Sequence, residues 1–560
     1  MTPSRSHLAA AVCALSLAAL GARAQQRDLA DAGVPLLDGG TEELTNAPVA
    51  PREESNDPGP PGSTQVLKGK DLQRFSYDDA AIALTQLPGI YSRGEDGLGL
   101  RPNLGIRGVN PDRSKKLTLL EDGIPFAPAT YSASAAYYFP LVERMDQLRV
   151  TKGPATLAYG PHTIGGAVDL ITRPIPRTQE VTLNASGGSF GYVKVHGTYG
   201  NDNGVDGFLL EGLHLTTSGF KHLPDGSSTG FFRNEAMFKY RHSFSSGRTN
   251  ELRLKVSYAD EDSHETYLGL SDEDLRKDPD QRYEASALDE MKNHRIAEVL
   301  TYELELAPGL RWISDLDRSD FSRTWSKINQ FRSGDLFKVT QDPHNPTLQG
   351  FYNILHGADT TSDDEKFEIG PNQRDFTSQG LQSTLFWQGT TGVLSHKLEA
   401  GFRLHNDYLN RHHSQDAFTQ VGGILVHDPT PTQITAVNQP WTVAYATHVM
   451  DSINWGRFTL MVALRDELVH ARFYNDLFDR AQAVPQGAKA TTYTKLLPGA
   501  SLAFAATPDL TVFVGSYRGF SPPPPDSLPA TPELSINSEA GIHMQRGAFT
   551  ADVVGYYDAY

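Results

Sequence analysis

The segment from Met145 to Arg173, MDQLRVTKGPATLAYGPHTIGGAVDLITR, constrains the fold of this chain more than any other part of the sequence. Two short β-patterned runs, Leu148–Thr151 and Ala167–Thr172, flank a centre rich in turn-forming residues. Glycine permits backbone conformations closed to other residues, and proline ends a strand's row of hydrogen-bond donors. The pattern therefore predicts a compact, tightly turned β unit. The turn residues are Gly153-Pro154, Gly160-Pro161 and Gly165-Gly166.

Together with three earlier motifs, this segment resembles the plug domain of TonB-dependent outer-membrane receptors. The earlier motifs are LTQLPGI at Leu84–Ile90, NLGIRG at Asn103–Gly108 and LTLLEDGIP at Leu117–Pro125. Each motif alone is weak, but four in the expected order identify the chain as a member of this family. The residues that carry the resemblance are Pro88, Gly89, Arg107, Gly108, Asp122, Gly123, Lys152, Gly153, Pro154, Tyr159, Gly160, Gly165 and Gly166.

Residues 1–24 have the form of a secretory signal peptide. Arg5 precedes the apolar run Leu8–Leu20, and Ala22-Arg23-Ala24 fits the small-x-small cleavage rule. The run is too short for a transmembrane helix. Cys13, the only cysteine, lies in this segment, so we expect a mature chain without disulfides, thiol catalysis or cysteine-bound metals.

Residues 25–62 are rich in Pro, Gly, Asp and Glu and lack the periodic apolar residues that a core needs, which predicts a mobile periplasmic arm. The resemblance implies that such an arm carries a TonB box, a short segment that pairs with TonB by strand addition. Val34-Pro35-Leu36-Leu37 and Val49 are the candidates, and they match poorly. A linker without a partner is an equal alternative. The arm is also too short for the signalling domain of some ferric citrate receptors.

Residues 63–176 are predicted to form the plug, a small α/β domain. A helical pattern covers Lys70–Leu87 and ends at Pro88-Gly89, and strand patterns follow at Leu104–Arg107 and Leu117–Leu120. Adjacent carboxylates on a strand point to opposite faces, so Glu121-Asp122 is not a catalytic pair. Asp122-Gly123 is better explained as a turn. The domain contains no catalytic constellation.

Cationic residues of the plug have two possible roles. Arg107, Lys116, Arg144 and Arg149 are expected to pair with acidic residues of a surrounding wall, rather than with an anionic ligand. The plug loops Ser92–Asn103 and Phe126–Pro140 are predicted to face the outside. By position, the resemblance makes Arg93, Arg101 and Tyr131 the candidate ligand-binding residues. For each of these three residues, an equal alternative is that the side chain only orders its loop.

Residues 177–560 carry long alternating segments that predict a transmembrane β-barrel. Glu251–Tyr258, for example, places Leu252, Leu254, Val256 and Tyr258 on one face and charged or polar residues on the other. A soluble sandwich also alternates, but repeated Arg, Lys and Glu on the second face favour a wet lumen. Further alternating segments are Glu298–Leu306, Lys397–His405 and Phe458–Arg465. Aromatic residues expected in interfacial girdles are Tyr258, Trp312, Trp387 and Trp455.

Asp260–Arg295 is predicted to be a long extracellular loop, and two stretches within it resemble a loop of ferric citrate-type receptors. These stretches are Glu265–Asp274 and Arg282–Met291; Arg518–Pro523 also resembles a barrel segment of that branch. The acidic run Asp272–Asp274 is expected to be a solvated face rather than a calcium site. The spacing of His405, His412 and His413 satisfies no tight zinc template.

The length of the barrel region falls short of the 22 strands that the resemblance implies. At roughly 24 residues for each strand and its connection, it supplies about sixteen strands. The sequence therefore predicts a C-terminally incomplete barrel that would not insert stably in an outer membrane.

The resemblance implies a monomeric Gram-negative outer-membrane receptor, in contact with membrane lipid and TonB. A formal net charge of −17 argues against nucleic acid as a partner. No motif indicates an enzyme or a bound cofactor. The resemblance implies TonB-energised uptake of a metal chelate, with a ferric siderophore or ferric citrate-like complex as the leading ligand. Alternatives are a cobalamin or oligosaccharide receptor, or a passive or adhesive surface barrel without active transport. A secreted β-rich hydrolase is disfavoured.

Overall fold

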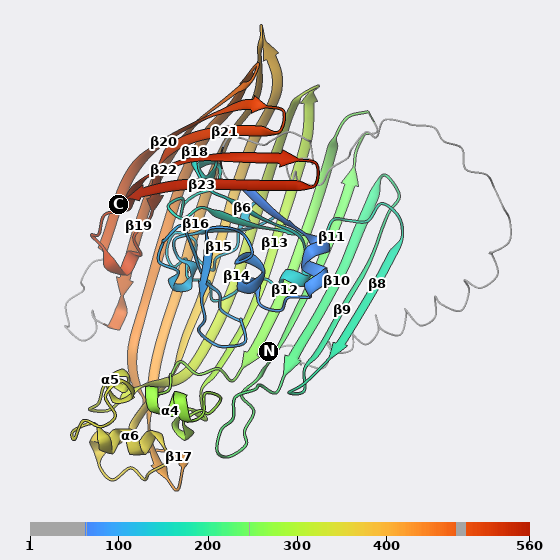
Figure 1. Ribbon diagram of the computed structural model, residues 1–560. Coiled ribbons are helices and arrows are strands. Elements are labelled where there is room, and N and C mark those ends of the chain that lie inside the picture. Colours follow the sequence, from blue (N-terminus) through green and yellow to red (C-terminus); the bar gives the residue numbers. More distant parts are fainter. Residues whose placement is uncertain (1–61, 63, 246, 478–488) are drawn as a thin grey trace, which may run out of the picture.

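A small N-terminal domain lies against the inside of a large curved sheet (Figure 1). The computed structural model describes residues 62–560 apart from residues 63, 246 and 478–488. The predicted signal peptide and all but the last residue of the predicted arm, including both TonB-box candidates, lie outside the described residues. None of the described helices is long and apolar enough to cross a membrane.

The N-terminal domain is the predicted α/β unit. Its five-stranded sheet has the order β1-β6-β7-β4-β5, and β2 and β3 form a separate hairpin. Within the sheet, β4 and β7 run parallel. Each strand predicted in this domain from the sequence is present in the structure, with its ends within a few residues of the predicted ones. The elements are β1 (Thr64–Lys68), α2 (Gly69–Phe75), α3 (Ala80–Leu84), β2 (Ile90–Arg93), β3 (Asn103–Ile106), β4 (Thr118–Glu121), β5 (Ile124–Pro125), β6 (Met145–Thr151) and β7 (Ala167–Thr172).

The single helix predicted over Lys70–Leu87 is wrong, because the segment forms two short helices. Ser76 ends α2 in the left-handed conformation, with φ 50°, and its N–H donates to the Leu72 carbonyl. Asp79 then begins α3, since its carboxylate accepts from the Ala81 N–H at 2.7 Å. This local capping outweighs the continuous apolar pattern.

The predicted turn at Asp122-Gly123 is confirmed. Both residues have positive φ, 54° and 79°, as a two-residue hairpin loop between β4 and β5 requires. The Asp122 side chain also accepts hydrogen bonds from the Thr172 N–H and hydroxyl, at 2.8 and 2.6 Å. The turn is thereby fixed against β7. A core of buried aliphatic side chains, including Leu148 and Leu170, lies on the sheet.

In the part of the chain that the structure describes, the large sheet contains sixteen strands. Fifteen of them form one continuous antiparallel path from β8 to β23, and β17 pairs with β16 alone. Among the described residues, β8 and β23 form its two edges. The strands are β8 (Glu180–Gly187), β9 (Val193–Asp202), β10 (Asp206–Thr217), β11 (Phe231–Ser243), β12 (Asn250–Ser263), β13 (Glu290–Ala307), β14 (Leu310–Phe331), β15 (Phe367–Thr391), β16 (Leu394–Val421), β17 (Ile424–His427), β18 (Gln433–Trp455), β19 (Phe458–Asn475), β20 (Lys489–Thr507), β21 (Leu510–Ser521), β22 (Glu533–Arg546) and β23 (Phe549–Ala559).

The strands present a polar face to the plug and an apolar face outward, as the sequence predicted. In β12, Ser257 and Glu261 are buried toward the plug, whereas Val256 and Tyr258 lie on the opposite face. Trp312, Trp387 and Trp455 lie near strand ends, as expected for a girdle. Tyr258 does not, because β12 continues beyond it to Ser263.

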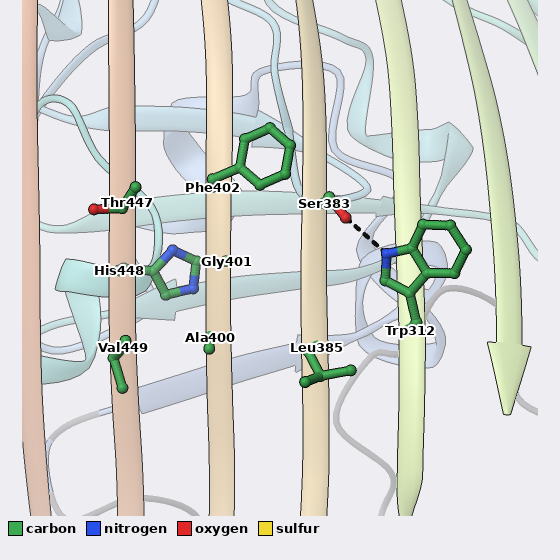
Figure 2. A pocket seen from close by; sticks show the side chains of 9 residues that line it. All are labelled: Trp312, Ser383, Leu385, Ala400, Gly401, Phe402, Thr447, His448 and Val449. Carbon is green, nitrogen blue, oxygen red and sulfur yellow. Dashed lines mark hydrogen bonds between the residues drawn. The ribbon is translucent and has the colours of Figure 1, made fainter. Parts of the chain in front are cut away.

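A shallow depression on the outer face spans β14, β15, β16 and β18 (Figure 2). Trp312 donates its indole N–H to the Ser383 hydroxyl at 2.7 Å on one side of this depression. Most of its lining belongs to the apolar outer face, so the depression is a feature of that surface rather than of the interior. Its lining residues are Trp312, Ser383, Leu385, Ala400, Gly401, Phe402, Thr447, His448 and Val449.

The two ends of the sheet differ. At one end the strands are joined by tight turns, such as residues 308–309, 392–393 and 456–457. At the other end, the loops 264–289 and 332–366 contain α4 (Asp272–Lys277), α5 (Leu336–Gln341) and α6 (Gln349–Leu355), and they pack with β17 around one apolar cluster. We call these two loops the cap; Figure 1 shows its helices together beside β17.

Two loop predictions are therefore corrected. The predicted loop Asp260–Arg295 is shorter, because β12 and β13 extend into both of its ends. The acidic run Asp272–Asp274 is only partly solvated: it forms the first turn of α4, where Asp272 is exposed but Asp274 is buried. The Asp274 carboxylate accepts from the hydroxyls of Tyr283 and Tyr352, so it organises the cap.

Candidate ligand-binding site

Three arginines lie directly opposite one another on neighbouring strands of the large sheet. Arg323 of β14 pairs in register with Arg374 of β15, and Arg374 pairs with Arg411 of β16. All three lie in the half of their strands nearer the cap. They belong to the face turned toward the plug, where Phe376 and Leu409 are buried. The register thus places three positive charges in one row.

Such a row is unfavourable unless something compensates for it, because like charges directly opposite on adjacent strands repel each other. Within the part of the chain that the structure describes, no carboxylate lies within 4.0 Å of Arg323 or Arg374; Arg411 has Asp526 at 3.7 Å. Nε of Arg323 and Nε of Arg411 are buried and have no hydrogen-bond partner among the described residues. Buried donors without partners cost free energy and point to a missing acceptor.

The plug completes the cluster with Tyr137 and Arg113. The guanidinium carbon of Arg323 lies 4.3 Å from the centre of the Tyr137 ring, and those of Arg113 and Arg374 lie 5.4 and 5.7 Å from it. Trp325 flanks Arg113 and Arg323. We call Arg113, Tyr137, Arg323, Arg374 and Arg411 the arginine cluster.

The pKa of Tyr137 reports the field of this cluster. Burial alone would raise the pKa of this phenol, but Arg323, Arg374 and Arg113 outweigh burial and lower the pKa to about 8. A site that favours a phenolate also favours other anions, since nearby positive charge stabilises any negative group placed there. The arginine cluster can therefore bind an anion without covalent chemistry.

The predicted ligand residues lie in different surroundings. Arg93 is exposed and has Asp112 3.6 Å away. Arg101 is buried and bonded to Glu261 of β12 at 2.5 Å. The hydroxyl of Tyr131 donates to Glu467 of β19 at 2.8 Å. Burial of the phenol, and to a lesser extent the negative charge of Glu467, raises the pKa of Tyr131. Arg101 and Tyr131 thus make plug-to-wall contacts, and the three residues do not form one site.

Three of the four cationic plug residues pair with acids of the wall. Arg107 bonds to Glu539 at 2.5 Å, and Lys116 bonds to Glu533. Arg144 bonds to Glu235 and Glu211, at 2.5 and 3.4 Å. Arg149 departs from the prediction, because its nearest carboxylate is Asp169, within the plug, at 4.0 Å.

The glycine motif of the plug packs tightly against the wall. Gly153 has φ 75°, and a Cβ there would overlap the Glu539 carboxylate. A Cβ at Gly160 would overlap the Arg465 guanidinium. Beside this motif, the Lys152 ammonium donates to the Pro88 carbonyl at 2.5 Å, and burial lowers its pKa to about 8.

The histidines weighed as zinc ligands do not converge. His405 bonds to Asp407 at 2.9 Å, whereas His413 lies eight residues further along β16, 3.3 Å from Nε of Arg374. Sequence reasoning missed Tyr137 and the three strand arginines. The only signal of the three arginines is their place on the polar face of alternating strands, and their register was needed to bring them together.

The large sheet has an apolar outer face, and its inner face holds a small domain and the arginine cluster. This arrangement is that of an outer-membrane receptor with a plug. Residues 59–167 match the family described as TonB-dependent Receptor Plug Domain, and residues 178–560 match TonB dependent receptor-like, beta-barrel. The chain belongs to the TonB-dependent receptor family, whose members are Gram-negative outer-membrane proteins. The loop-bearing end of the sheet is accordingly the extracellular end, since such barrels have short periplasmic turns.

The comparisons with solved structures show the fold. The unliganded ferric citrate transporter FecA is similar with a TM-score of 0.72 and 19% identity, over 88% of this chain and 69% of that one. The siderophore receptor PiuA from Acinetobacter baumannii is similar with a TM-score of 0.67 and 14% identity, over 88% and 72%.

Among curated proteins, the vitamin B12 transporter BtuB of Vibrio cholerae serotype O1 is 26% identical over 186 residues. That alignment covers 32% of this chain and 30% of the transporter.

Proposed function

We propose that this chain is a receptor for an anionic metal chelate, with a ferric citrate-like or acidic ferric siderophore complex as its ligand. The arginine cluster carries this proposal. It brings four guanidinium groups to one place, whereas among the described residues the carboxylates within 4.0 Å of these groups are Glu95, which pairs with Arg113, and Asp526, which lies beside Arg411. A ligand with two or more negative charges would balance the two remaining arginines.

Uptake in this proposal is driven by TonB, acting through the arm at residues 25–62. A ligand bound in the arginine cluster would contact the plug directly, because Arg113 and Tyr137 lie on plug loops. Movement of the plug would then require exchange of its ion pairs with the wall, including that of Arg107 with Glu539. No covalent chemistry and no cofactor are needed.

Binding of ferric citrate to the purified chain in detergent tests the proposal, with tryptophan fluorescence as the readout because Trp325 lies in the site. Arg323→Gln and Arg374→Gln should each weaken binding tenfold or more, since a charge-assisted hydrogen bond contributes about 1.5–3 kcal/mol. The matched control is Arg318→Gln, an exposed arginine on the same strand, bonded to Asp320 at 2.7 Å. It should leave the affinity unchanged.

Other ligands separate the remaining alternatives. A neutral ferric trihydroxamate and cyanocobalamin should bind much more weakly than ferric citrate. Tighter binding of either, or unchanged ferric citrate affinity in the Arg323 and Arg374 variants, would reject an anionic ligand at this site. In cells, deletion of residues 25–62 should abolish energised uptake; unchanged uptake would favour a passive barrel.

A further inference from the structure

Three side chains with metal-binding atoms converge where β12 and β13 separate at the extracellular end. Asp262, His264 and Glu290 each place one oxygen or nitrogen atom within 4.8 Å of the other two. The last pair of the ladder joins Ser263 to Met291. His264 follows Ser263, and Glu290 precedes Met291. These two residues therefore face each other just beyond the last strand pair, at the base of the cap loop 264–289.

These side chains lie on the outer face of the sheet. Glu261 and Ser263 are buried toward the plug, so the alternating Asp262 and His264 point the other way. Lys292 lies directly opposite Asp262 on that same face. The group is therefore separate from the lumen and from the arginine cluster.

The local charges are not balanced. The Lys292 ammonium lies 2.5 Å from Oε2 of Glu290 and 3.6 Å from Oδ2 of Asp262, so one positive charge serves two carboxylates. Oδ1 of Asp262 is shielded from solvent and has no hydrogen-bond partner among the described residues. For the ring of His264, the described part of the chain likewise supplies no hydrogen bond. Asp262 thus has a buried acceptor without a partner, and one of its oxygens lies within 4.8 Å of a nitrogen of the His264 ring.

The neighbouring acid on this face is already satisfied. Asp260 accepts from the Asn234 amide at 2.7 Å and from the Tyr258 hydroxyl at 3.2 Å. His294 pairs in register with Asp260, one step further from the cap. On this face, the groups without a hydrogen-bond partner among the described residues at the loop base are Oδ1 of Asp262 and the ring of His264.

We propose that Asp262, His264 and Glu290 bind a divalent transition-metal ion, for which Zn²⁺ is the probe. One imidazole nitrogen and two carboxylate oxygens are ligands that zinc accepts, with water in the fourth position. Three atoms this close all lie within about 2.8 Å of a common point, so small side-chain rotations reach the zinc bond length of about 2.1 Å. Calcium and magnesium prefer more oxygen ligands and no imidazole.

Lys292 would leave on metal binding. Its side chain is half exposed, so it can turn into solvent without losing a buried contact. The ion would then join the start of the loop 264–289 to its end. Because this loop supplies α4 to the cap, the metal would hold the cap to the barrel rim, on the side away from the lumen.

Titration of the purified full chain in detergent with Zn²⁺, in competition with a chromophoric chelator, tests this inference. His264→Ala and Glu290→Gln should each weaken zinc affinity more than tenfold. Lys292→Ala should tighten it, because a competing ammonium is removed. His344→Ala is the matched control: this loop histidine also bonds to a glutamate, Glu273, at 3.0 Å, but lies outside the group.

Failure of the chain to bind Zn²⁺ would overturn the inference. So would equal losses in the His264 and His344 variants, or weaker binding in Lys292→Ala, which would make the lysine part of the site. Glu290→Gln keeps the size and hydrogen-bonding capacity of the side chain, so a lost affinity there reflects the missing charge rather than misfolding. Unchanged β-sheet circular dichroism verifies this for each variant.

Discussion

Arg144 of the plug and Glu235 of strand β11 form a 2.5 Å ion pair in which neither side chain is exposed to solvent. Glu235 also accepts from the Leu141 N–H and from Arg233, and Glu211 lies 3.4 Å from the same Arg144 guanidinium. The pair therefore lies at the centre of a buried network that joins plug to wall.

Removing Arg144 should loosen the plug strongly. Arg144→Met leaves Glu235 and Glu211 buried with one cation fewer, and breaking a buried ion pair by deleting one partner costs about 3–5 kcal/mol. Limited proteolysis of the plug, followed over increasing urea concentration, measures the loss. Arg318→Met, at an exposed pair, should cost less than about 1 kcal/mol. Similar effects of the two variants would show that the network does not hold the plug.

Acid should weaken the contact between the plug and β21 through His162. Its Nε2–H donates to the Thr130 carbonyl at 2.8 Å, and Nδ1 accepts from the Ser521 hydroxyl at 2.9 Å. Burial lowers the pKa of this ring from 6.5 to about 4. The neutral ring therefore contributes stability that is complete above pH 6.5 and is lost as the pH falls toward 4, about 3 kcal/mol in all.

Urea unfolding at pH 7.5 and pH 4 checks the contribution of His162. Wild-type protein should lose about 3 kcal/mol more than His162→Gln over this interval. His344→Gln, at an exposed loop histidine, should behave as wild type. An equal acid loss in the His162 variant would contradict the assignment.

The cap should open when Asp274 is replaced. Besides the two tyrosine hydroxyls, its Oδ2 has Nε2 of His356 at 3.0 Å and the Ser271 hydroxyl at 2.9 Å. Burial raises the pKa of this carboxyl, but Tyr352, Tyr283 and Ser271 outweigh burial and lower it. Asp274→Ala leaves these donors without their acceptor, which should cost about 2–3 kcal/mol of cap stability.

Trypsin cleavage after Lys277 measures this opening, because α4 must unfold before it is cut. Cleavage should accelerate in Asp274→Ala and remain at the wild-type rate in Asp272→Ala, whose exposed carboxylate lies in the same helical turn. Equal acceleration in both variants would mean that helix charge, and not the buried network, holds the cap.

The sequence predicted those features that depend on local patterns. The plug strands and the turn at Asp122-Gly123 follow from short motifs, and the faces of β12 follow from alternation. The break at Ser76 was missed because a single left-handed residue overrides an apolar pattern that continues on both sides.

The arginine cluster could not be predicted in the same way. Arg323, Arg374 and Arg411 belong to three strands joined by a 35-residue loop, 332–366, and by a tight turn, so their alignment depends on a register that no local pattern specifies. Arg101 also depends on a tertiary contact. Its loop is predicted to face the outside, and the structure places its guanidinium beside Glu261 of the wall, where it is buried.

Ionisation of Tyr137 provides a measurement of the arginine cluster that does not depend on ligand uptake. Its pKa of about 8 lies below the ordinary value of 10, so between these values the phenol is ionised in the folded chain and neutral in the unfolded one. Stability from this group is thus present above pH 10 and is lost as the pH falls through 8.

The ionisation of Tyr137 can be followed as the difference in absorbance at 295 nm between wild type and Tyr137→Phe, and this difference should titrate near pH 8. Arg323→Gln should move that titration toward higher pH, since it removes the largest of the charges that lower the pKa, and Arg318→Gln should not. Bound ferric citrate should also raise it, because the anion neutralises the same guanidinium groups. A difference titration near pH 10 in wild type would mean that the cluster does not act on Tyr137.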